Sequence, residues 1–255
     1  MVNLRSRVTR LGVLDIGSNT IHMLIVDAAP GARPDPEAST KSTVRLMQYV
    51  KDDGSIKKSG IEAILTAVDQ CMELAEEYDI TQLLAMATSA IKEAPNSNKI
   101  LRKIEERIGQ SVTVLSGTDE ARLTFLAARR WYGWDAGRLL MLDIGGSSLE
   151  VAMGSDEEPT VALSAAAGAC RITREYLPEG TASVDELEVV RKKVRRILEP
   201  MVDAFPKSKH PAHAVGTSKT FRSLARLAGA VLRQSGREDT WIMTREQLED
   251  WIPRL

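Results

Sequence analysis

The chain of 255 residues has few cysteines, few aromatic residues and almost no net charge. Cys71 and Cys170 are far apart and have no further Cys or nearby His at metal-ligand spacing, which excludes a disulfide framework and a zinc site. We expect both to be small packed residues in a reducing compartment. The net charge of -1 gives no overall field that would attract nucleic acid.

Long apolar runs are also missing, and none approaches the roughly 20 residues that a membrane-spanning helix needs. The first residues are basic and precede an apolar stretch, as in a signal peptide, but Asp15 interrupts that stretch and no small-residue cleavage site follows. We therefore interpret this stretch as a first β-strand. The expectation is a cytoplasmic protein with neither a membrane nor a nucleic acid as partner.

What the sequence does contain is an internal repeat. LGVLDIGSNTIHMLIVD begins at Leu11 and LLMLDIGGSSLEVAMGS begins at Leu139. Each copy is typical of an apolar strand, an Asp-Ile-Gly turn and a second strand, and the two aspartates, Asp15 and Asp143, lie 128 residues apart. A repeat of this length predicts two similar domains.

The residues around the two copies alternate between helical and strand patterns, which favours an α/β fold. Helices are expected over 60–78, 96–108, 121–132, 184–198 and 220–232, and strands over 83–87, 112–115, 160–163 and 212–215. Residues 116–120 are interpreted as a polar turn. A turn near 133–137 precedes the second copy, so we place the domains at 1–134 and 135–255.

The two Asp-Ile-Gly turns suggest phosphate chemistry. Glycine and small hydroxyl residues after a buried strand let backbone N–H groups approach a phosphate. A carboxylate beside that phosphate needs a divalent cation such as Mg²⁺ between them. Glu150 occupies the position of His22 in the first copy, so a carboxylate that could orient water is present in one copy only. His22 is expected to be a packed histidine.

A third turn, Gly216-Thr217-Ser218-Lys219-Thr220, precedes a predicted helix. Its N–H groups and Lys219 could hold an anion, or its hydroxyls could simply cap the helix. The turn lacks the spacing of a nucleotide-binding P-loop.

DIGSNT, GTDEARLTF and DIGGSSLE together resemble the exopolyphosphatase and guanosine pentaphosphate phosphohydrolase family, part of the sugar-kinase, heat-shock ATPase and actin superfamily. The resemblance implies two actin-like (ribonuclease H-like) domains with an interdomain cleft. It implies a hydrolase that releases terminal orthophosphate from inorganic polyphosphate with Mg²⁺ or another divalent cation. The alternatives are guanosine pentaphosphate hydrolysis and a module that binds guanosine tetraphosphate with little turnover. A kinase-like activity would need an adenosine site that the sequence does not reveal.

The resemblance also assigns residues. Glu120 and Glu150 are the expected catalytic acids, and which one is the base stays open. The expected metal ligands are Asp15, Asp143 and Glu150. The expected phosphate-binding residues are Ser18, Asn19, Thr20, Lys92, Gly145, Gly146, Ser147, Ser148, Gly216, Thr217, Ser218 and Lys219.

The chain departs from the family pattern in four places. Ser147 replaces a glycine and would crowd its turn if its φ were positive, and Lys92 replaces an arginine, which exchanges a bidentate fork for a point charge. The small residues of 164–170 predict loose packing. The chain stops at Leu255, so we expect the second domain to lack its last helices and to expose apolar surface, which favours a homodimer or instability.

Overall fold

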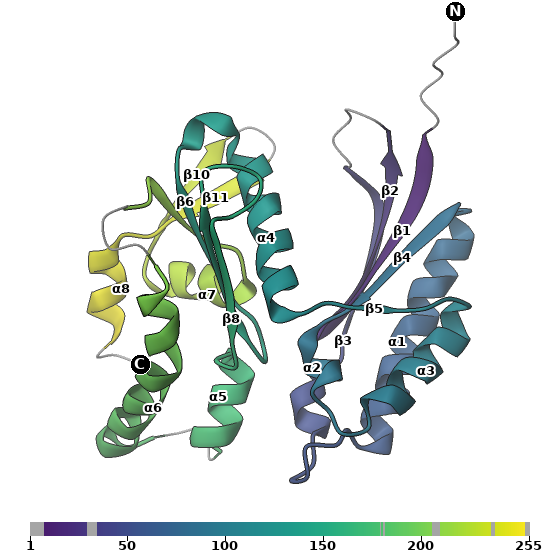
Figure 1. Cartoon of the computed structure of the whole chain (residues 1–255), viewed down its shortest axis with the longest axis horizontal. Helices are drawn as coiled ribbons and strands as arrows, with labels where there is room; N and C mark the ends of the chain where they lie inside the picture. Colours follow the sequence, from purple (N-terminus) through teal and green to yellow (C-terminus); the bar gives the residue numbers. More distant parts are fainter. Residues whose placement is uncertain are drawn as a thin grey trace, which may run out of the picture. The chain divides into compact units, whose positions relative to one another are not determined.

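The computed structural model describes residues 8–29, 35–178, 180, 182–205, 210–235 and 238–252. Its internal contacts divide the chain into two compact units, Met1–Ser116 and Gly117–Leu255, which we call unit 1 and unit 2. Both units are built from a mixed β-sheet with helices packed against it (Figure 1).

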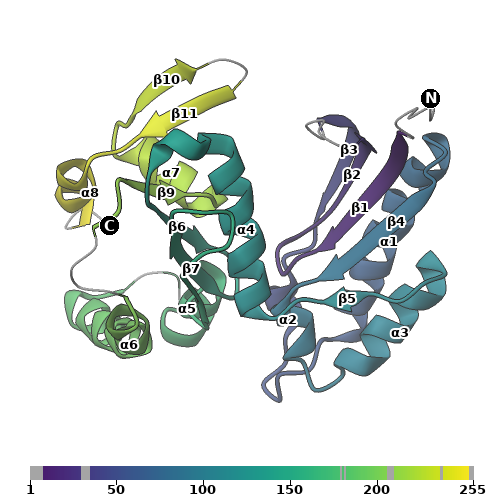
Figure 2. The ribbon, with the colours of Figure 1, turned by 45° about the horizontal axis from the view of Figure 1, so that its top comes forward.

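Unit 1 contains a five-stranded sheet in the order β3-β2-β1-β4-β5. β1 and β2 form an antiparallel hairpin, and β1 pairs with β4 in parallel. Helices α1 and α3 cover one face of this sheet in both ribbon views (Figures 1 and 2). The elements are β1 (Thr9–Ile16), β2 (Thr20–Ala28), β3 (Pro36–Thr43), η1 (Leu46–Tyr49), α1 (Lys58–Glu77), β4 (Gln82–Ala87), α2 (Ser89–Lys92), α3 (Ser97–Ile108) and β5 (Thr113–Val114).

The core of unit 1 follows from the helical spacing of α1. Apolar side chains three or four positions apart lie on one face of this helix and are buried against β2 and β3. They are Ile61, Ile64, Leu65, Val68, Cys71 and Ala75. The helix expected over 60–78 is thus confirmed, as are the strand over 83–87 and the helix that begins at 96 or 97.

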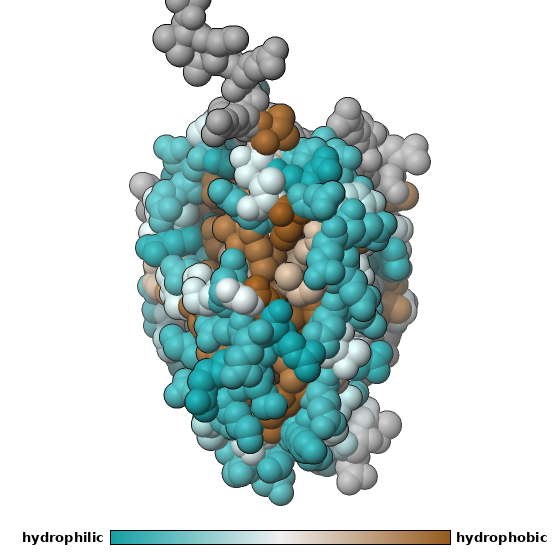
Figure 3. Space-filling view, turned by 90° about the vertical axis from the view of Figure 1, so that its right-hand side faces the viewer, coloured by the Kyte–Doolittle hydropathy of each residue, from teal (hydrophilic) through white to brown (hydrophobic). Residues whose placement is uncertain are grey.

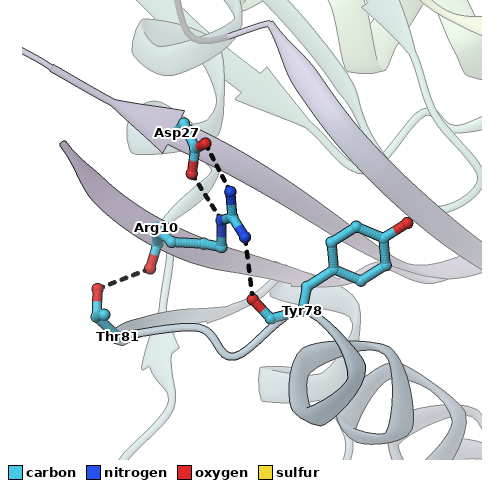
Figure 4. Close-up of polar contacts among 4 residues, drawn as sticks. All are labelled: Arg10, Asp27, Tyr78 and Thr81. Atoms are coloured by element: carbon cyan, nitrogen blue, oxygen red, sulfur yellow. Dashed lines mark hydrogen bonds and ion pairs between the residues drawn. The ribbon is translucent and has the colours of Figure 1, made fainter.

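The start of β1 is held by a polar cluster (Figure 4). Arg10 and Asp27 are cross-strand partners, and the guanidinium donates two hydrogen bonds of 2.8 Å to the Asp27 carboxylate. The same guanidinium reaches the carbonyl of Tyr78, and the Thr81 hydroxyl donates to the Arg10 carbonyl. The hydrogen bonds from Arg10 hold the pKa of Asp27 below its usual value. This cluster fixes the strand end opposite the Asp15 turn.

Unit 2 contains a four-stranded sheet in the order β8-β7-β6-β9 and a separate β10-β11 hairpin. The β6–β7 pair is antiparallel, and β6 pairs with β9 in parallel. The elements are α4 (Gly117–Tyr132), η2 (Trp134–Ala136), β6 (Leu139–Ile144), β7 (Leu149–Gly154), β8 (Val161–Ala165), α5 (Ala169–Tyr176), α6 (Val184–Asp203), β9 (His213–Gly216), α7 (Lys219–Leu227), β10 (Val231–Ser235), β11 (Glu238–Ile242) and α8 (Arg245–Trp251).

Every residue of β7 is buried, because apolar clusters cover both faces of the unit 2 sheet. On one face Phe125 and neighbouring residues of α4 pack against Met141 and Ala152. On the other face Val151 packs with Met201 of α6. β7 is therefore covered by apolar side chains on both faces.

The two sheets confirm the internal repeat. β3-β2-β1-β4 and β8-β7-β6-β9 share the same order, the same antiparallel hairpin and the same parallel neighbour. The compact units divide earlier than the boundary we placed after residue 134, because α4 belongs to the core of unit 2. That helix also begins at Gly117, so the interpretation of 116–120 as a polar turn is wrong for most of its length.

Two further expectations are wrong. The last expected helix, 220–232, ends at Leu227, because Gly229 adopts a positive φ of 66° and the chain continues as β10. Cys170 is exposed at the start of α5, whereas Cys71 is buried as expected. Within the described residues, no helix is long and apolar enough to cross a bilayer.

Candidate active site

The turn at the end of β6, residues 145–148, is the unit-2 turn. The Gly145 N–H donates to the Ser148 carbonyl at 2.9 Å, which closes the turn between β6 and β7. Ser147 is not among the residues with positive φ, and its exposed fraction is 3%. The crowding that we expected from its Cβ is therefore absent, and serine fits the turn without backbone strain.

Residues 168–171 lie directly behind the unit-2 turn and form what we call its buttress. The N–H groups of Gly168, Ala169 and Arg171 donate to the carbonyls of residues 147, 145 and 146 at 2.9–3.2 Å. The Arg171 Nε donates to the Ser147 carbonyl at 2.8 Å. A Cβ on Gly168 would lie only 2.4 Å from backbone atoms of the turn. Gly168 thus packs tightly against the turn, so our expectation of loose packing over 164–170 is wrong at this residue, whereas Ser164, Ala166 and Cys170 are exposed.

The buttress engages the carbonyl side of the unit-2 turn. Within the described residues, the N–H groups of Gly146, Ser147 and Ser148 donate to no backbone carbonyl. Successive N–H groups in a fixed turn form a concave anion site. The carbonyls of the turn are therefore held by the buttress, while these three N–H groups lie outside the backbone hydrogen bonds of the described residues.

Four polar side chains cross the sheet of unit 2 next to this turn, one from each strand or strand end, and we call them the polar row. They are Thr217, Asp143, Glu150 and Ser164, in the spatial order β9, β6, β7, β8. Asp143 and Glu150 are directly paired across β6 and β7, so their side chains leave the same face of the sheet. Thr217 Oγ1 donates to Asp143 Oδ2 at 2.6 Å, and Ser164 Oγ donates to Glu150 Oε1 at 2.8 Å.

The two carboxyls of the polar row are protonated more easily than ordinary carboxyls. Desolvation raises the pKa of Asp143, and the hydrogen bond from Thr217 partly offsets this rise. Desolvation also raises the pKa of Glu150, and the nearby charge of Asp143 adds to the rise against hydrogen bonds from Ser148 and Ser164. Glu150 has an exposed fraction of only 4%. Raised carboxyl pKa values in a pair are a common property of acid–base sites.

The turn between β9 and α7 is hydrogen-bonded to the last residue of β6. The Ser218 hydroxyl accepts from the N–H of Ile144 at 3.3 Å and from that of Phe221 at 3.4 Å, so it caps α7. The Thr220 hydroxyl donates to the Ile144 carbonyl at 2.8 Å. Ser218 is thus a helix cap, as one of the two interpretations of this turn expected, and Thr217 belongs to the polar row. Anion binding by this turn stays a prediction. Lys219, the first residue of α7, is exposed.

Glu120 is brought to the same region by the start of α4. A Cβ on Gly117 would lie 2.4 Å from the Ser164 Cβ and Oγ, so the first residue of α4 lies directly against the polar row. Glu120 is in the first turn of this helix and is partly exposed. Within unit 2 the residues predicted from GTDEARLTF, from DIGGSSLE and from the turn 216–220 thus lie at one end of the sheet.

The corresponding row in unit 1 carries different charges. Lys41, His22 and Asp15 face one another across β3, β2 and β1. Asp15 lies at the end of the sheet and is exposed. Desolvation of its carboxyl raises its pKa, and the positive charge of Lys41 opposes this rise. Desolvation and the charge of Lys41 both lower the pKa of His22, which is half-buried and so only partly packed. Unit 1 therefore has an imidazole and a cation at the two positions where unit 2 has the carboxyl of Glu150 and the hydroxyl of Ser164.

The unit-1 turn, residues 17–20, is closed in the same way, with a Gly17 N–H to Thr20 carbonyl hydrogen bond of 3.0 Å. The N–H groups of Val44 and Arg45 donate to the Asn19 carbonyl, so the turn also has a segment behind it. Arg45 adopts a left-handed conformation with φ 51° and is exposed. Sequence reasoning missed Lys41, on the edge strand β3, and Arg45, which directly precedes η1.

Ser18, Asn19, Thr20 and Lys92 also lie at this end of unit 1. Lys92 is exposed at the end of α2, which follows β4. Because β4 pairs in parallel with β1, α2 begins at the edge where the unit-1 turn lies, and the Thr88 N–H donates to the Ile16 carbonyl at 3.2 Å. The Thr88 hydroxyl is buried and makes no hydrogen bond in the described structure, which leaves it available to a ligand atom.

The donors in the polar row suit a hard divalent cation. Among the described residues, no three His, Cys, Asp or Glu side chains form a metal-binding group. Of the expected ligands, Asp15 belongs to unit 1, whereas Asp143 and Glu150 belong to unit 2. Mg²⁺ is commonly held by one or two carboxylates together with waters and substrate phosphates. Asp143 and Glu150, paired on adjacent strands beside a turn rich in N–H donors, match that pattern.

The fold defines an actin-like α/β protein in which each of two similar units carries a glycine turn after its first strand. A model of the Ppx/GppA phosphatase family matches residues 24–255, and the chain belongs to this family. This confirms the resemblance drawn from the sequence motifs.

Individual relatives agree. Exopolyphosphatase 1 of Mycobacterium tuberculosis is 47% identical over 89% of this chain, which spans 66% of the relative's length. An uncharacterized protein of Streptomyces coelicolor is 38% identical, with 96% of this chain and 73% of that protein covered. The chain thus corresponds to about two thirds of the length of the mycobacterial enzyme.

Solved structures support the fold. The crystal structure of an exopolyphosphatase from Cytophaga hutchinsonii matches with a TM-score of 0.76 and 26% identity, over 86% of this chain and 70% of that one. The Aquifex aeolicus member of the Ppx/GppA family matches with a TM-score of 0.72 and 22% identity, over 97% and 78% of the two chains. The actin-like fold class expected from the sequence is confirmed.

Proposed function

We propose that this protein hydrolyses the terminal phosphoanhydride bond of inorganic polyphosphate and releases orthophosphate. The observation that carries the proposal is the polar row, in which two paired carboxyls with raised pKa values lie beside a turn of N–H donors. Similarity to the mycobacterial exopolyphosphatase 1, at 47% identity, favours polyphosphate over guanosine pentaphosphate as substrate.

The residues divide the work by their chemistry. The N–H groups of Gly146, Ser147 and Ser148 bind the oxygens of the terminal phosphate, and Thr217 orients the Asp143 carboxylate through its 2.6 Å hydrogen bond. A divalent ion, proposed as Mg²⁺, would be held by Asp143 and Glu150 and would supply charge neutralisation at the phosphate oxygens.

Hydrolysis then needs an oriented water. Its oxygen bonds to the terminal phosphorus, the bond from phosphorus to the bridging oxygen breaks, and the shortened chain leaves with that oxygen. A carboxylate takes the proton of the water. Glu150 is fixed by Ser164, whereas Glu120 lies on the first turn of a helix whose start touches Ser164. We assign the base to one of these two glutamates.

We propose supporting roles for Ser18, Asn19, Thr20 and Lys92 of unit 1 and for Ser218 and Lys219 of unit 2. Ser218 acts by holding the end of β6 in place, since its hydroxyl accepts from Ile144. Lys92 and Lys219 are exposed cations at the sheet ends that carry the turns, where they can attract phosphate as point charges.

A phosphate-release assay tests the proposal. Long-chain polyphosphate, guanosine pentaphosphate and ATP are each incubated with the protein, with Mg²⁺ or with EDTA. We expect release from polyphosphate that EDTA abolishes. Glu120→Gln and Glu150→Gln separate the two acids: the variant of the base should lose roughly 100-fold or more in kcat.

Glu188→Gln, on the exposed face of α6, is the matched control and should retain full turnover. No release from any of the three substrates by the wild-type protein would refute the proposed activity. Full turnover in both glutamate variants would refute the mechanism.

A further inference from the structure

A second basic site lies in unit 1, at the start of α1 and α3, apart from the unit-1 turn. A pocket with a volume of about 330 Å³ opens here. Four lysines, Lys51, Lys58, Lys99 and Lys103, line it together with Asn96, and we call it the lysine pocket. Unit 1 contains seven lysines, so more than half of them line this one pocket.

The floor of the lysine pocket is apolar. Ile56, Ile61 and Leu65 line it and are themselves buried, with exposed fractions of 2%, 7% and 9%. On the side of unit 1 formed by α1 and α3, hydrophobic residues gather in a depression between hydrophilic margins (Figure 3). A low-polarity floor strengthens the attraction between lysines and an anion above it, because water screens the charges from one side only.

The charge balance of the lining is strongly positive. Glu62 is the one acidic residue of the described lining and lies 3.6 Å from Lys58 across one helical turn. The lining thus holds four cations and one anion, and the charge of Lys51 also acts on the nearby Asp53 carboxylate. The volume matches the lower end of small-ligand pockets. Like charges this close repel one another, so an anion that bridges them is stabilised.

The backbone around the lysine pocket adds to this preference. Both α1, of 20 residues, and α3, of 12 residues, begin here without an acidic residue in the first turn and without a side-chain cap. The Asn96 amide instead bonds both backbone groups of Ile56, at 3.0 and 2.9 Å, which ties the two helix starts together. The positive ends of two helices therefore face the same lysines.

The lysine pocket is linked to the unit-1 turn through η1. The Leu46 N–H donates to the Ser18 carbonyl at 2.7 Å, and the Lys57 N–H donates to the Tyr49 carbonyl at 2.8 Å. The four residues of η1 span about 8 Å at the rise of a 3₁₀ helix. An extended anion with many phosphates could thus contact the turn and the pocket at once, whereas a single orthophosphate could not.

The composition of the pocket favours a particular anion. Its described lining holds no aromatic side chain and no arginine, so it offers neither a stacking surface for a base nor a planar fork. Lysines on flexible stems suit a polymer of phosphates that slides through without a fixed orientation. We infer that the lysine pocket is a binding site for the distal phosphates of a polyphosphate chain; this choice of ligand rests on the proposed function.

Binding in EDTA tests the inference without turnover. Isothermal titration calorimetry measures the affinity of the full chain for long-chain polyphosphate and for tripolyphosphate across a salt series. Lys99→Gln/Lys103→Gln should weaken long-chain binding roughly tenfold. It should also reduce the slope of log affinity against log salt by about 1.4, at about 0.7 for each lost contact. Tripolyphosphate binding should change less than twofold.

The matched control is Lys192→Gln/Lys193→Gln, which removes the same charge from exposed positions of α6. We expect it to bind long chains as the wild type does. Lys51→Gln/Lys58→Gln provides a second pocket variant on other elements and should reproduce the loss. In steady state, both pocket variants should raise KM for long chains about tenfold with kcat unchanged.

Equal losses in the pocket and control variants would overturn the inference, since they would report only overall charge. Unchanged long-chain affinity in both pocket variants would also overturn it while leaving the hydrolase intact. Guanosine tetraphosphate binding that the pocket substitutions abolish, with long chains unaffected, would assign the pocket to a nucleotide instead. Long-chain binding that depends on the pocket lysines supports the inference even if no substrate is hydrolysed.

Discussion

Gly168→Ala is the sharpest test of the site. In the present backbone, Gly168 has φ -71° and ψ 153°, a conformation that alanine adopts without strain. The new Cβ would nevertheless lie 2.4 Å from the Ser147 carbonyl carbon and from the Ser148 nitrogen. Ordinary contacts begin at 3.4 Å, so the unit-2 turn or its buttress must move by about 1 Å.

A shift of about 1 Å in the unit-2 turn should lower both stability and the rate of phosphate release. Overpacking in a tight site costs about 1–3 kcal/mol of stability. In a domain of this size each kcal/mol lowers Tm by about 2–4 °C. Misplacing substrate-binding groups by about 1 Å can cost about 100-fold in rate. We therefore expect phosphate release at 25 °C to fall about 100-fold in a variant that is still folded at that temperature.

Gly154→Ala is the matched control, because its Cβ would also meet backbone, 2.8 Å from the Pro159 Cα, but at the far end of β7 from the turn. It should lower Tm by a similar amount and keep most of its kcat. Measuring kcat and Tm for both variants separates a displaced turn from general destabilisation. A Gly168→Ala protein that is folded and within threefold of the wild-type kcat would refute the role of the buttress.

Thr217→Val removes the 2.6 Å hydrogen bond that orients Asp143 and lowers its pKa, so Asp143 should bind Mg²⁺ less tightly. Half-maximal phosphate release should then require a roughly tenfold higher Mg²⁺ concentration. Thr217→Ser keeps the hydroxyl and should behave as the wild type. Glu150→Gln should raise the urea midpoint at pH 7, because the raised folded-state pKa of Glu150 means that stability is lost as pH rises above the unfolded-state value; a lower urea midpoint would contradict this. Asp27→Asn should lower the urea midpoint at pH 7, because the ion pair with Arg10 lowers the pKa of Asp27 in the folded protein. The stabilisation from this pair is lost as pH falls through that folded-state pKa, so below it the variant and the wild type should have the same midpoint. An equal loss at both pH values would contradict this.

The repeat and the catalytic acids could be predicted from the sequence because they are local patterns. Asp143 and Glu150 flank a short hairpin, so the pairing of their strands follows from the turn between them. The strand and helix periods likewise located most elements. The start of α4 was misplaced because Gly117 and Thr118 resemble turn residues, and only packing against the unit 2 sheet makes them helical.

The buttress could not be predicted in the same way. Gly168 touches a turn twenty residues earlier in the chain, and nothing in a run of small residues indicates which backbone they approach. The lysine pocket is similarly non-local, since Lys51 and Lys103 come from segments separated by a whole helix and strand. Sequence patterns report the faces of single elements, whereas these contacts arise where separate elements meet.

The polar row of unit 2 and the corresponding row of unit 1 carry different side chains on the same strand arrangement. The residues that set the charge of each row are strand positions, while the turn backbone is held by a different segment, 168–171 in unit 2 and 44–46 in unit 1. The charge of each row can therefore be changed by substitution on the strands without altering the segment that holds the turn backbone. Replacing His22 with Glu and Lys41 with Ser would transplant the acidic row into unit 1 on a turn that is already held in shape.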